Sequence, residues 1–482
     1  MIQYHDGLGR PWQTISVKAG RNNAGTSYMN LCERTDYDAS GRPYKTWLPF
    51  RTSSVTPQTS ANPSESIYSD SEAFSFVEYD GSPLDRPMAE YGPGVKWHTN
   101  GKAVRHGYYT NGFTQLLNVN SYRINTARDT TVIVNRNGMH AYTTLSVKSV
   151  KDEDGLTLLT FTDLLGRTVL ERRHPASGED LDTYYLYDDM GRLAVVMPPA
   201  LAKIAATSPT RLNDADIDKY AYLYTYDANG NCTAKKLPGS GWTRYIYDKG
   251  NRPVFSQDAE NRRMGRWMFS FSDILGRNCV SGYCEGNMET LKQAISSSNV
   301  VATRQGNASG PYMGYSVSGL SLTNPVVLSV SYYDDYSFID TDVPSDKRSL
   351  MNYSAEYGLT KWDNVHGLQT GSAERILGED VTNDFRWSAC YYDKKGNLIQ
   401  AHTTRTDGGV DVTTTEVTFT GKPNRMHIIH AYGKPEELNE YYEYTYDNWE
   451  RPLTVKHRMD ENAAWTVLSD IQYDGLGRVK SE

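Results

Sequence analysis

The sequence predicts a mainly β protein, built as one long antiparallel sheet of repeated hairpins with a few short helices. Tyrosine is in large excess, with 36 Tyr against 11 Phe and 9 Trp, and tyrosine favours strands. Turn-forming residues are abundant, with 39 Gly and 20 Pro. A short aromatic-Asp-x-x-Gly pattern also recurs along the chain, and internal repeats of this kind indicate a repeated structural unit.

The low hydrophobic content agrees with a wide sheet. Hydrophobic residues make up 38% of the chain, against roughly 45–50% in ordinary globular domains. Length alone suggests about three domains for 482 residues. A sheet with large polar faces explains the composition better than three compact cores.

Composition and charge exclude several classes of protein. The most apolar run, residues 193–206, contains Pro198, Pro199 and Lys203 and falls short of the ~18 residues of a membrane helix. Residues 1–6 lack the basic and apolar parts of a signal peptide. A net charge of −8 argues against nucleic-acid binding.

Each repeat unit carries an aromatic residue, then Asp, two variable residues, Gly, and Arg or Asn. In some copies one residue separates the aromatic residue from the Asp, and two copies have Asn251 or Glu450 in place of Gly. The predicted structural turn residues are Asp6, Gly9 and Arg10; Asp38, Gly41 and Arg42; Asp163, Gly166 and Arg167; Asp188, Gly191 and Arg192; Asp227 and Gly230; Asp248 and Arg252; Asp273, Gly276 and Arg277; Asp393 and Gly396; Asp447 and Arg451; and Asp474, Gly477 and Arg478.

The physical chemistry of this unit predicts a hairpin turn. Asp at the first position and Gly at the fourth are typical of a type I turn, in which the Asp carboxylate accepts backbone N–H bonds. The Gly takes positive φ and forms the bulge that closes the hairpin. Asn251 tolerates that conformation, whereas Glu450 does so poorly, and we expect a different turn there.

The segments before the turns alternate like strands. Tyr220, Tyr222, Tyr224 and Tyr226 are expected on one strand face. The shorter steps run from 21 residues (Asp227 to Asp248) to 27 (Asp447 to Asp474), which accommodates two strands and their turns. Because one hairpin is not stable alone, we expect neighbouring hairpins to form a long sheet.

Three segments are expected to be helical. Residues 199–206 begin with proline, residues 213–219 form a capped turn, and residues 286–297 carry Met288, Leu291 and Ile295 at helical spacing. Residues 52–70, rich in Ser, Thr and Pro, are expected to form a loop.

The repeats resemble the YD repeats of the bacterial RHS (rearrangement hotspot) family. The resemblance rests on the ten turn units and on stretches such as residues 237–248, and it is strongest over 150–280 and 385–482. Residues 1–135 resemble the uncharacterised module that precedes these repeats, through residues 6–11, 37–38 with 47–49, and 82–86. We therefore expect an N-terminal module over 1–135 and a repeat sheet over 136–482, less regular around 285–385.

The resemblance implies a curved sheet that forms part of an RHS-type β-shell. Such shells enclose a polymorphic C-terminal effector, often a toxin, of the same polypeptide, in secreted or cell-surface proteins. The sequence has no Asp-Pro-x-x-Gly closing signature, and we interpret it as a fragment of a longer protein.

Residues with chemical potential have simpler structural interpretations. The Asp and Arg residues recur in ten similar units, which indicates the same structural role, closure of a turn, in each unit. A glycosidase instead needs two carboxylates in one cleft. His427 and His430 are the only close histidine pair, and on a strand they face opposite sides, which is wrong for joint metal ligation. Cys279 and Cys284 lack a second ligand pair for zinc and are expected to be buried thiols.

The sequence therefore predicts a non-catalytic structural protein with no cofactor and no metal site. Its expected partner is the C-terminal effector domain of the parent protein, with no nucleic acid and no membrane insertion. The alternative is a secreted or surface module that binds glycans or a protein through exposed Tyr and Trp. An enzyme is a third possibility, for which the sequence offers no constellation of residues.

Overall fold

The computed structural model describes residues 1–22, 27–126, 132–208, 210–306, 312–318, 320–378 and 384–482. It is mainly β, and 27 strands are assigned to one antiparallel sheet that is not closed. The chain divides into two units. Unit 1 comprises residues 1–225, 235–240 and 472–482, and unit 2 comprises residues 226–234 and 241–471.

The strands of unit 1 pair one after another in antiparallel order, with β7 paired directly to β10. They are β1 (Ile2–His5), β2 (Pro11–Arg21), β3 (Tyr28–Tyr37), β4 (Pro43–Thr52), β5 (Phe74–Tyr79), β6 (Pro87–Tyr91), β7 (Ala103–Thr110), β10 (Ser146–Lys151), β11 (Thr157–Thr162), β12 (Thr168–His174), β13 (Leu181–Tyr187), β14 (Leu193–Met197) and β15 (Tyr222–Tyr226). Strand β16 (Cys232–Lys236) is divided between the units, and Tyr226 at the end of β15 belongs to unit 2.

Unit 2 repeats the same arrangement, with β20 paired directly to β23. Its strands are β17 (Thr243–Tyr247), β18 (Pro253–Gln257), β19 (Arg266–Ser272), β20 (Asn278–Glu285), β23 (Thr323–Asp334), β24 (Val365–Arg375), β25 (Phe385–Tyr392), β26 (Leu398–Thr404), β27 (Val410–Val417), β28 (Pro423–Tyr432), β29 (Leu438–Tyr446), β30 (Pro452–Arg458) and β31 (Thr466–Asp470).

Short elements fill the connections. Three two-stranded sheets pair β8 (Asn120–Thr126) with β9 (Val132–Met139), β21 (Ala302–Arg304) with β22 (Tyr315–Val317), and β32 (Gln472–Tyr473) with β33 (Val479–Ser481). The helices are α1 (Glu65–Tyr68), α2 (Val95–Thr99), α3 (Pro199–Thr207), α4 (Asp214–Tyr220), α5 (Ala259–Arg263), α6 (Met288–Ile295), α7 (Ser337–Thr341) and the 3-10 helix η1 (Arg348–Met351).

The helices begin where the sequence indicates. α3 has Pro199 at its first position, and the side chains of Asn213 and Asn287 cap α4 and α6 by accepting backbone N–H bonds. Two expectations need correction. Tyr220 ends α4 and does not lie in β15, because the helix continues up to the strand. The expected loop over 52–70 contains the short helix α1.

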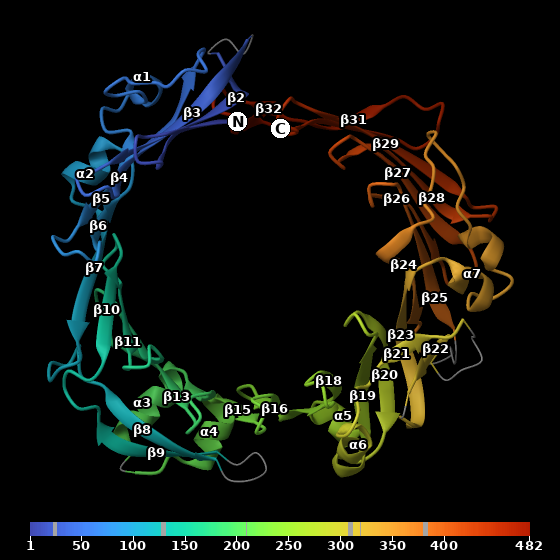
Figure 1. The fold of residues 1–482 in the computed structure, drawn as a ribbon, viewed down its shortest axis with the longest axis horizontal. Helices are drawn as coiled ribbons and strands as arrows, with labels where there is room; N and C mark the ends of the chain where they lie inside the picture. Colours follow the sequence, from blue (N-terminus) through green and yellow to red (C-terminus); the bar gives the residue numbers. More distant parts are fainter. Residues whose placement is uncertain (23–26, 127–131, 209, 307–311, 319, 379–383) are drawn as a thin grey trace. The chain divides into compact units, whose positions relative to one another are not determined.

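These connections bury one face of most strands in each unit, whereas β29, β30 and β31 contain no buried residue. In unit 2, α6, α7 and the β21–β22 hairpin lie on one side of the strands (Figure 1). The buried core there is aromatic: the rings of Tyr332 and Phe338 stack 4.6 Å apart, and Trp267 and Trp387 are buried. In unit 1, α3, α4 and the β8–β9 hairpin lie on one side of β11–β15 (Figure 1).

Antiparallel strands alternate in direction, and the turns after every second strand therefore lie at the same end of the strands. In unit 1 these are the turns after β1, β3, β5, β11 and β13. In unit 2 they are the turns after β17, β19, β25, β27 and β29. In each of these hairpins the register shifts by a bulge just before the turn. Each unit therefore carries a row of regularly spaced turns at one end of its strands, here called the turn row.

Candidate functional surface along the Asp-Arg turns

The ten predicted turns share one hydrogen-bond geometry. In each, one carboxylate oxygen of the Asp accepts the backbone N–H groups two and four residues later, at 2.8–3.0 Å. The other oxygen accepts Nε of the following Arg, or Nδ2 of Asn, at 2.6–3.1 Å. The carboxylate thus satisfies the turn's otherwise unpaired donors.

These bonds favour the ionised carboxylate. The side chain of Arg10 lowers the pKa of Asp6, and the backbone amide of Arg42 lowers the pKa of Asp38. Burial opposes ionisation of Asp163, but the bonds from Arg167 lower its pKa overall. The turn is therefore held shut by a charge-assisted network at neutral pH.

The fourth position has positive φ in all ten turns: +57° at Glu450, +59° at Asn251, and +77° to +87° at the eight glycines. The expectation of a different turn at Glu450 is wrong. The amides of Trp449 and Arg451 donate to the Asp447 carboxylate at 2.8 and 3.0 Å, as in the other copies. Lys422 also contacts the carbonyl of Glu450. These bonds outweigh the left-handed strain of one residue, which costs about 1–2 kcal/mol.

The cation that closes a turn also covers a tyrosine of the next hairpin. The guanidinium of Arg10 lies 4.4 Å from the ring centroid of Tyr37, and the Tyr37 hydroxyl donates to the carbonyl of Pro11 at 2.8 Å. The acceptor is the residue that follows the cation, so each tyrosine is held by its ring and its hydroxyl. The same pair of contacts links Arg42 with Tyr79, Arg86 with Tyr108, Arg167 with Tyr187, Arg277 with Tyr333, and Lys422 with Tyr446.

Residues outside the predicted set complete the row. Asp80 and Arg86 close a turn two residues longer, with the Arg86 Nε donating to Asp80 at 2.9 Å. Thr418 and Lys422 close another, in which the Thr418 hydroxyl accepts the Lys422 amide at 3.1 Å. The Gly three residues after Thr418, followed by a basic residue, was the available signal. Sequence reasoning required Asp and therefore missed it.

One turn is tied to a distant strand. The Arg277 guanidinium bonds Asp273 at 2.7 Å and Asp334 at 2.6 and 2.9 Å. The side-chain bond from Arg277 lowers the pKa of Asp334 to about 2. Nothing local in the sequence indicates Asp334, because it lies 57 residues from Arg277.

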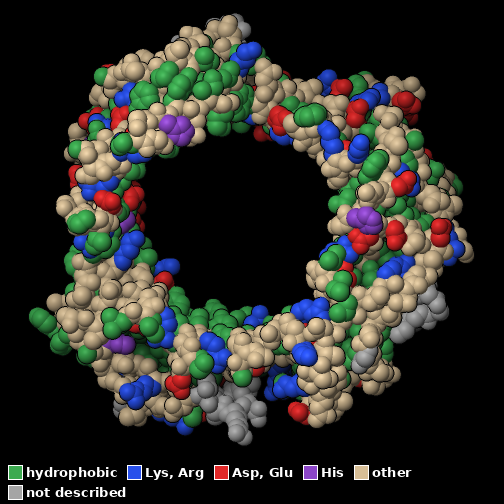
Figure 2. Space-filling model, viewed as in Figure 1, with side chains coloured by type: hydrophobic (Ala, Val, Ile, Leu, Met, Phe, Trp, Pro, Cys, Tyr) green, Lys and Arg blue, Asp and Glu red, His purple; other side chains and the backbone are tan. Residues whose placement is uncertain are grey.

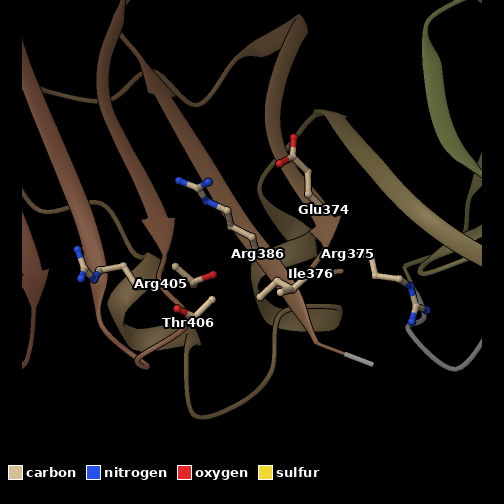
Figure 3. Close-up of a pocket in the computed structure, with 7 residues that line it drawn as sticks. Glu374, Arg375, Ile376, Arg386, Arg405 and Thr406 are labelled. Atoms are coloured by element: carbon tan, nitrogen blue, oxygen red, sulfur yellow. The ribbon is translucent and has the colours of Figure 1, made fainter. Parts of the chain in front are cut away.

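Figure 3 shows a pocket of about 430 Å³ in unit 2, lined in part by Arg375, Arg386 and Arg405. The three guanidinium groups lie apart and do not converge on one point (Figure 3). Arg375 donates to the carbonyl of Val327, and Arg405 donates to Asp407. Arg375 and Arg405 therefore serve separate local contacts, and the three cations do not form a convergent anion site.

The histidine pair is divided between the two faces of β28. His427 is buried, with Nδ1 2.8 Å from Glu356 and Nε2 2.8 Å from Asn439, and its ring stacks on Tyr441 at 4.2 Å. His430 is half-buried and lies 3.5 Å from Glu440. The two rings therefore have separate partners.

The sequence-predicted thiols are buried. Cys279 and Cys284 are free cysteines of β20, and burial raises the pKa of Cys284 to about 11. Among the described residues, no group of three or more His, Cys, Asp or Glu side chains is placed to hold a metal ion. No helix in the described part of the chain is long and apolar enough to cross a membrane.

Comparison with known proteins gives partial matches. A family described as a domain of unknown function (DUF6443) matches residues 1–110, within the predicted N-terminal module. No curated protein sequence matches the chain. The fold is similar to chains in crystal structures titled TcdB2-TccC3-Cdc42 (TM-score 0.45, 15% identity, 99% of this chain and 21% of the other) and TcdB2-TccC3 (0.42, 15%, 99% and 22%).

A third similar chain belongs to the Tc holotoxin pore of Photorhabdus luminescens, with a TM-score of 0.43 and 15% identity over 99% of this chain and 21% of the other. The present chain spans about a fifth of the length of the solved chains it matches.

Proposed function

We propose that the chain is a non-catalytic segment of an RHS-type YD-repeat shell that encloses a C-terminal effector or toxin domain of the same secreted or surface-exposed parent protein. The observation that carries the proposal is the contrast between the faces of the sheet. Over most strands one face is buried under the chain's own helices and hairpins, and the other face is open and carries many hydroxyl and charged side chains.

In unit 2 the face opposite the core carries many hydroxyl and charged side chains, with some apolar ones such as Ile428 among them. Ser281 bonds Ser329 across two strands at 2.6 Å, and Ser388 bonds Thr403 at 3.2 Å. The same face carries the half-buried Thr413 on β27 and the exposed Arg386 on β25. Paired hydroxyl groups form hydrogen bonds with one another and offer little apolar contact area to a partner.

Unit 1 has a face of the same kind. The Tyr185 hydroxyl donates to Glu171 at 3.0 Å on the side of β12 and β13 opposite the buried Leu170 and Tyr184. Thr160 lies on this side of β11. Figure 2 shows basic and acidic side chains interspersed with apolar ones over the visible surface. A surface without a large apolar patch is not expected to hold one partner tightly, which suits enclosure of variable cargo.

The turn row explains how such a sheet keeps its form without a partner on the polar face. Each cation–tyrosine contact joins a hairpin to the next one along the edge, for example Arg42 to Tyr79. The sheet is therefore stabilised by the contacts of the turn row and by the elements packed on one of its faces.

Site-specific photo-crosslinking tests the proposal in the full chain followed by a C-terminal test domain. Photo-crosslinking residues at Thr160 or Thr413 are expected to capture the test domain. The same residues at Lys203 on α3 or Gln293 on α6, which lie on the covered side, are expected not to do so. Equal capture from both sides, or capture from the helices alone, overturns the proposal.

A depression in unit 1 favours glycan binding as a second candidate function. It has a volume of about 710 Å³, and its lining includes Trp12, Tyr37 and Glu33. Hydroxyl side chains lie beside one another here, because Thr35 pairs with Thr46 and Thr46 pairs with Ser75. Aromatic rings beside hydroxyls and a carboxylate suit a sugar.

A glycan array with the full chain tests this second candidate. Saturable binding is expected to disappear in Trp12→Ala and to persist in Trp362→Ala, a half-exposed tryptophan outside the depression. Absence of binding, or equal loss in both variants, contradicts it.

A further inference from the structure

The first and last turns of the chain share one pentapeptide, Asp-Gly-Leu-Gly-Arg, at residues 6–10 and 474–478. Their geometries match closely. The amide of Leu8 donates to Asp6 at 2.8 Å, and that of Leu476 donates to Asp474 at 2.9 Å. The fourth residues have φ of +78° and +80°. The two turns therefore present the same backbone groups at their tips.

Their surroundings differ. The last turn lies, within unit 1, against the ends of β2 and β4 at the edge opposite the turn row. The backbone amide of Arg21 donates to the carbonyl of Gly475 at 3.1 Å. The Asp474 and Arg478 side chains act electrostatically on Tyr68, next to the same strand ends. Leu476 is half-buried there.

The tip of the first turn is bare. Nothing lies within 4 Å of a Cβ added at Gly7, and Leu8 is 78% exposed. An exposed leucine at a turn tip has no role in closing the turn, because the hydrogen bonds of the turn use only the Asp, the Arg and the backbone.

Close contact at the last turn depends on a glycine from each side. A Cβ on Gly475 would lie 2.7 Å from the carbonyl oxygen of Arg21, and one on Gly20 would lie 2.4 Å from the carbonyl oxygen of Gly475. Both obstacles are backbone atoms, which cannot turn aside as a side chain does. The strand ends at Gly20, Arg21 and Arg51, here called the strand-end site, thus accept a turn only when glycine follows its Asp.

We propose that the strand-end site is a docking site for the Asp-Gly-Leu-Gly-Arg turn, and that the first turn of one copy of this chain docks on the strand-end site of a second copy. The match of sequence, backbone and glycine position carries the proposal, since the same contacts are open to both turns. In the intact chain the last turn occupies the site, so association requires that turn to leave. The contact joins two different surfaces, the first turn of one copy and the strand-end site of the next. Repeated contacts of this kind build a head-to-tail chain of copies.

The test frees the site in the full chain with Gly475→Val, which places a side chain against Arg21. Analytical ultracentrifugation over roughly a hundredfold range of concentration then reports mass. The unmodified chain is expected to stay at 54.3 kDa. The Gly475→Val variant is expected to rise with concentration toward twice that mass and beyond. The double variant Gly7→Val/Gly475→Val is expected to stay monomeric.

Two controls complete the design. Gly81 follows Asp80 in another turn and has nothing within 4 Å, so Gly81→Val/Gly475→Val should associate as Gly475→Val does. Trypsin cleavage after Arg478 or Lys480 reports release of the last turn. The Gly7→Val/Gly475→Val chain has an open strand-end site but a blocked first turn, whereas the unmodified chain has an intact first turn and an occupied site. A mixture of the two should therefore give one-to-one complexes.

The outcomes are decisive in either direction. A monomeric Gly475→Val chain with a released last turn overturns the proposal, as does association that survives Gly7→Val. If the last turn remains docked with valine at position 475, the glycine requirement is wrong and the proposal falls.

Discussion

The guanidinium carbon of Arg277 lies 4.4 Å from the ring centroid of Tyr333, and the Tyr333 hydroxyl donates to the carbonyl of Asn278, the residue after Arg277. Two hairpin strands, β20 and β23, are thereby joined at the turn edge. Arg277 also bonds two carboxylates, that of Asp273 in the turn between β19 and β20 and that of Asp334 at the end of β23. Because Arg277 bonds two carboxylates and covers a tyrosine ring, it is a suitable place to test what the row of turns does.

We expect Arg277→Lys to lower the free energy of unfolding by about 2 kcal/mol. Lysine keeps the charge but cannot bond two carboxylates in a planar fork or stack on the tyrosine. Urea unfolding monitored by tryptophan fluorescence measures the change. Arg263→Lys is the control, since its pair with Glu260 is largely exposed and should show no measurable loss. An unchanged urea midpoint in Arg277→Lys contradicts the role assigned to the row.

Asp334 predicts a specific acid sensitivity. Its pKa in the folded chain is lowered to about 2 by Arg277, against about 3.9 for an unperturbed Asp. Its contribution to stability is therefore present above about pH 4 and is lost as the pH falls toward 2. Unfolding measured between these pH values should depend less steeply on pH in Asp334→Asn. Equal slopes for the variant and the unmodified chain would rule out this contribution.

Two buried histidines predict opposite effects of pH. Burial lowers the pKa of His402, so its contribution is present above about 6.5 and is lost as the pH falls below that value. Burial also opposes charging of His427, but bonds to Glu356 and Asn439 raise its pKa overall. Its contribution is present below about 6.5 and is lost as the pH rises through the folded pKa.

The measurement is unfolding at mildly acidic and mildly basic pH for His402→Gln and His427→Gln. The first variant should lose most stability at basic pH, and the second at acidic pH. The same pH trend in both variants contradicts the assignment. His430→Gln, on the other face of β28, serves as the control for loss of an imidazole.

The fourth position of the turn predicts a stabilising substitution. Glu450 has φ of +57°, and Glu450→Gly relieves that strain at the cost of a more flexible unfolded chain. We expect a net gain of about 0.5 kcal/mol. Gly396→Ala, with φ of +82°, should lose about 1 kcal/mol. Gly81→Ala is the matched control, since Gly81 has no positive φ and open space around it.

The turns were predictable in detail because their hydrogen bonds join atoms within five residues. The turn at Asp38, Gly41 and Arg42 is closed by such local bonds. Sequence reasoning failed at Glu450 because it weighed one residue's φ preference without the bonds from its neighbours to Asp447. It failed at Thr418 because a hydroxyl performs part of the carboxylate's work.

Long-range partners had no comparable signal in the sequence. The alternation of side chains places His427 and His430 on opposite faces of a strand, and this follows from strand geometry alone. That Glu356 meets His427, 71 residues away, depends on how the connection after β23 folds over the sheet. The same holds for Asp334 beside Arg277.

Local sequence therefore settles the hairpin, its bulge and the face on which each side chain lies, because these depend on dihedral preferences and bonds between near neighbours. Tertiary structure alone decides which face is buried and which of two identical turns is covered. Residues 6–10 and 474–478 cannot be told apart by their own atoms. They differ because the last turn meets Gly20, Arg21 and Arg51, and such a contact depends on the path of the chain between them.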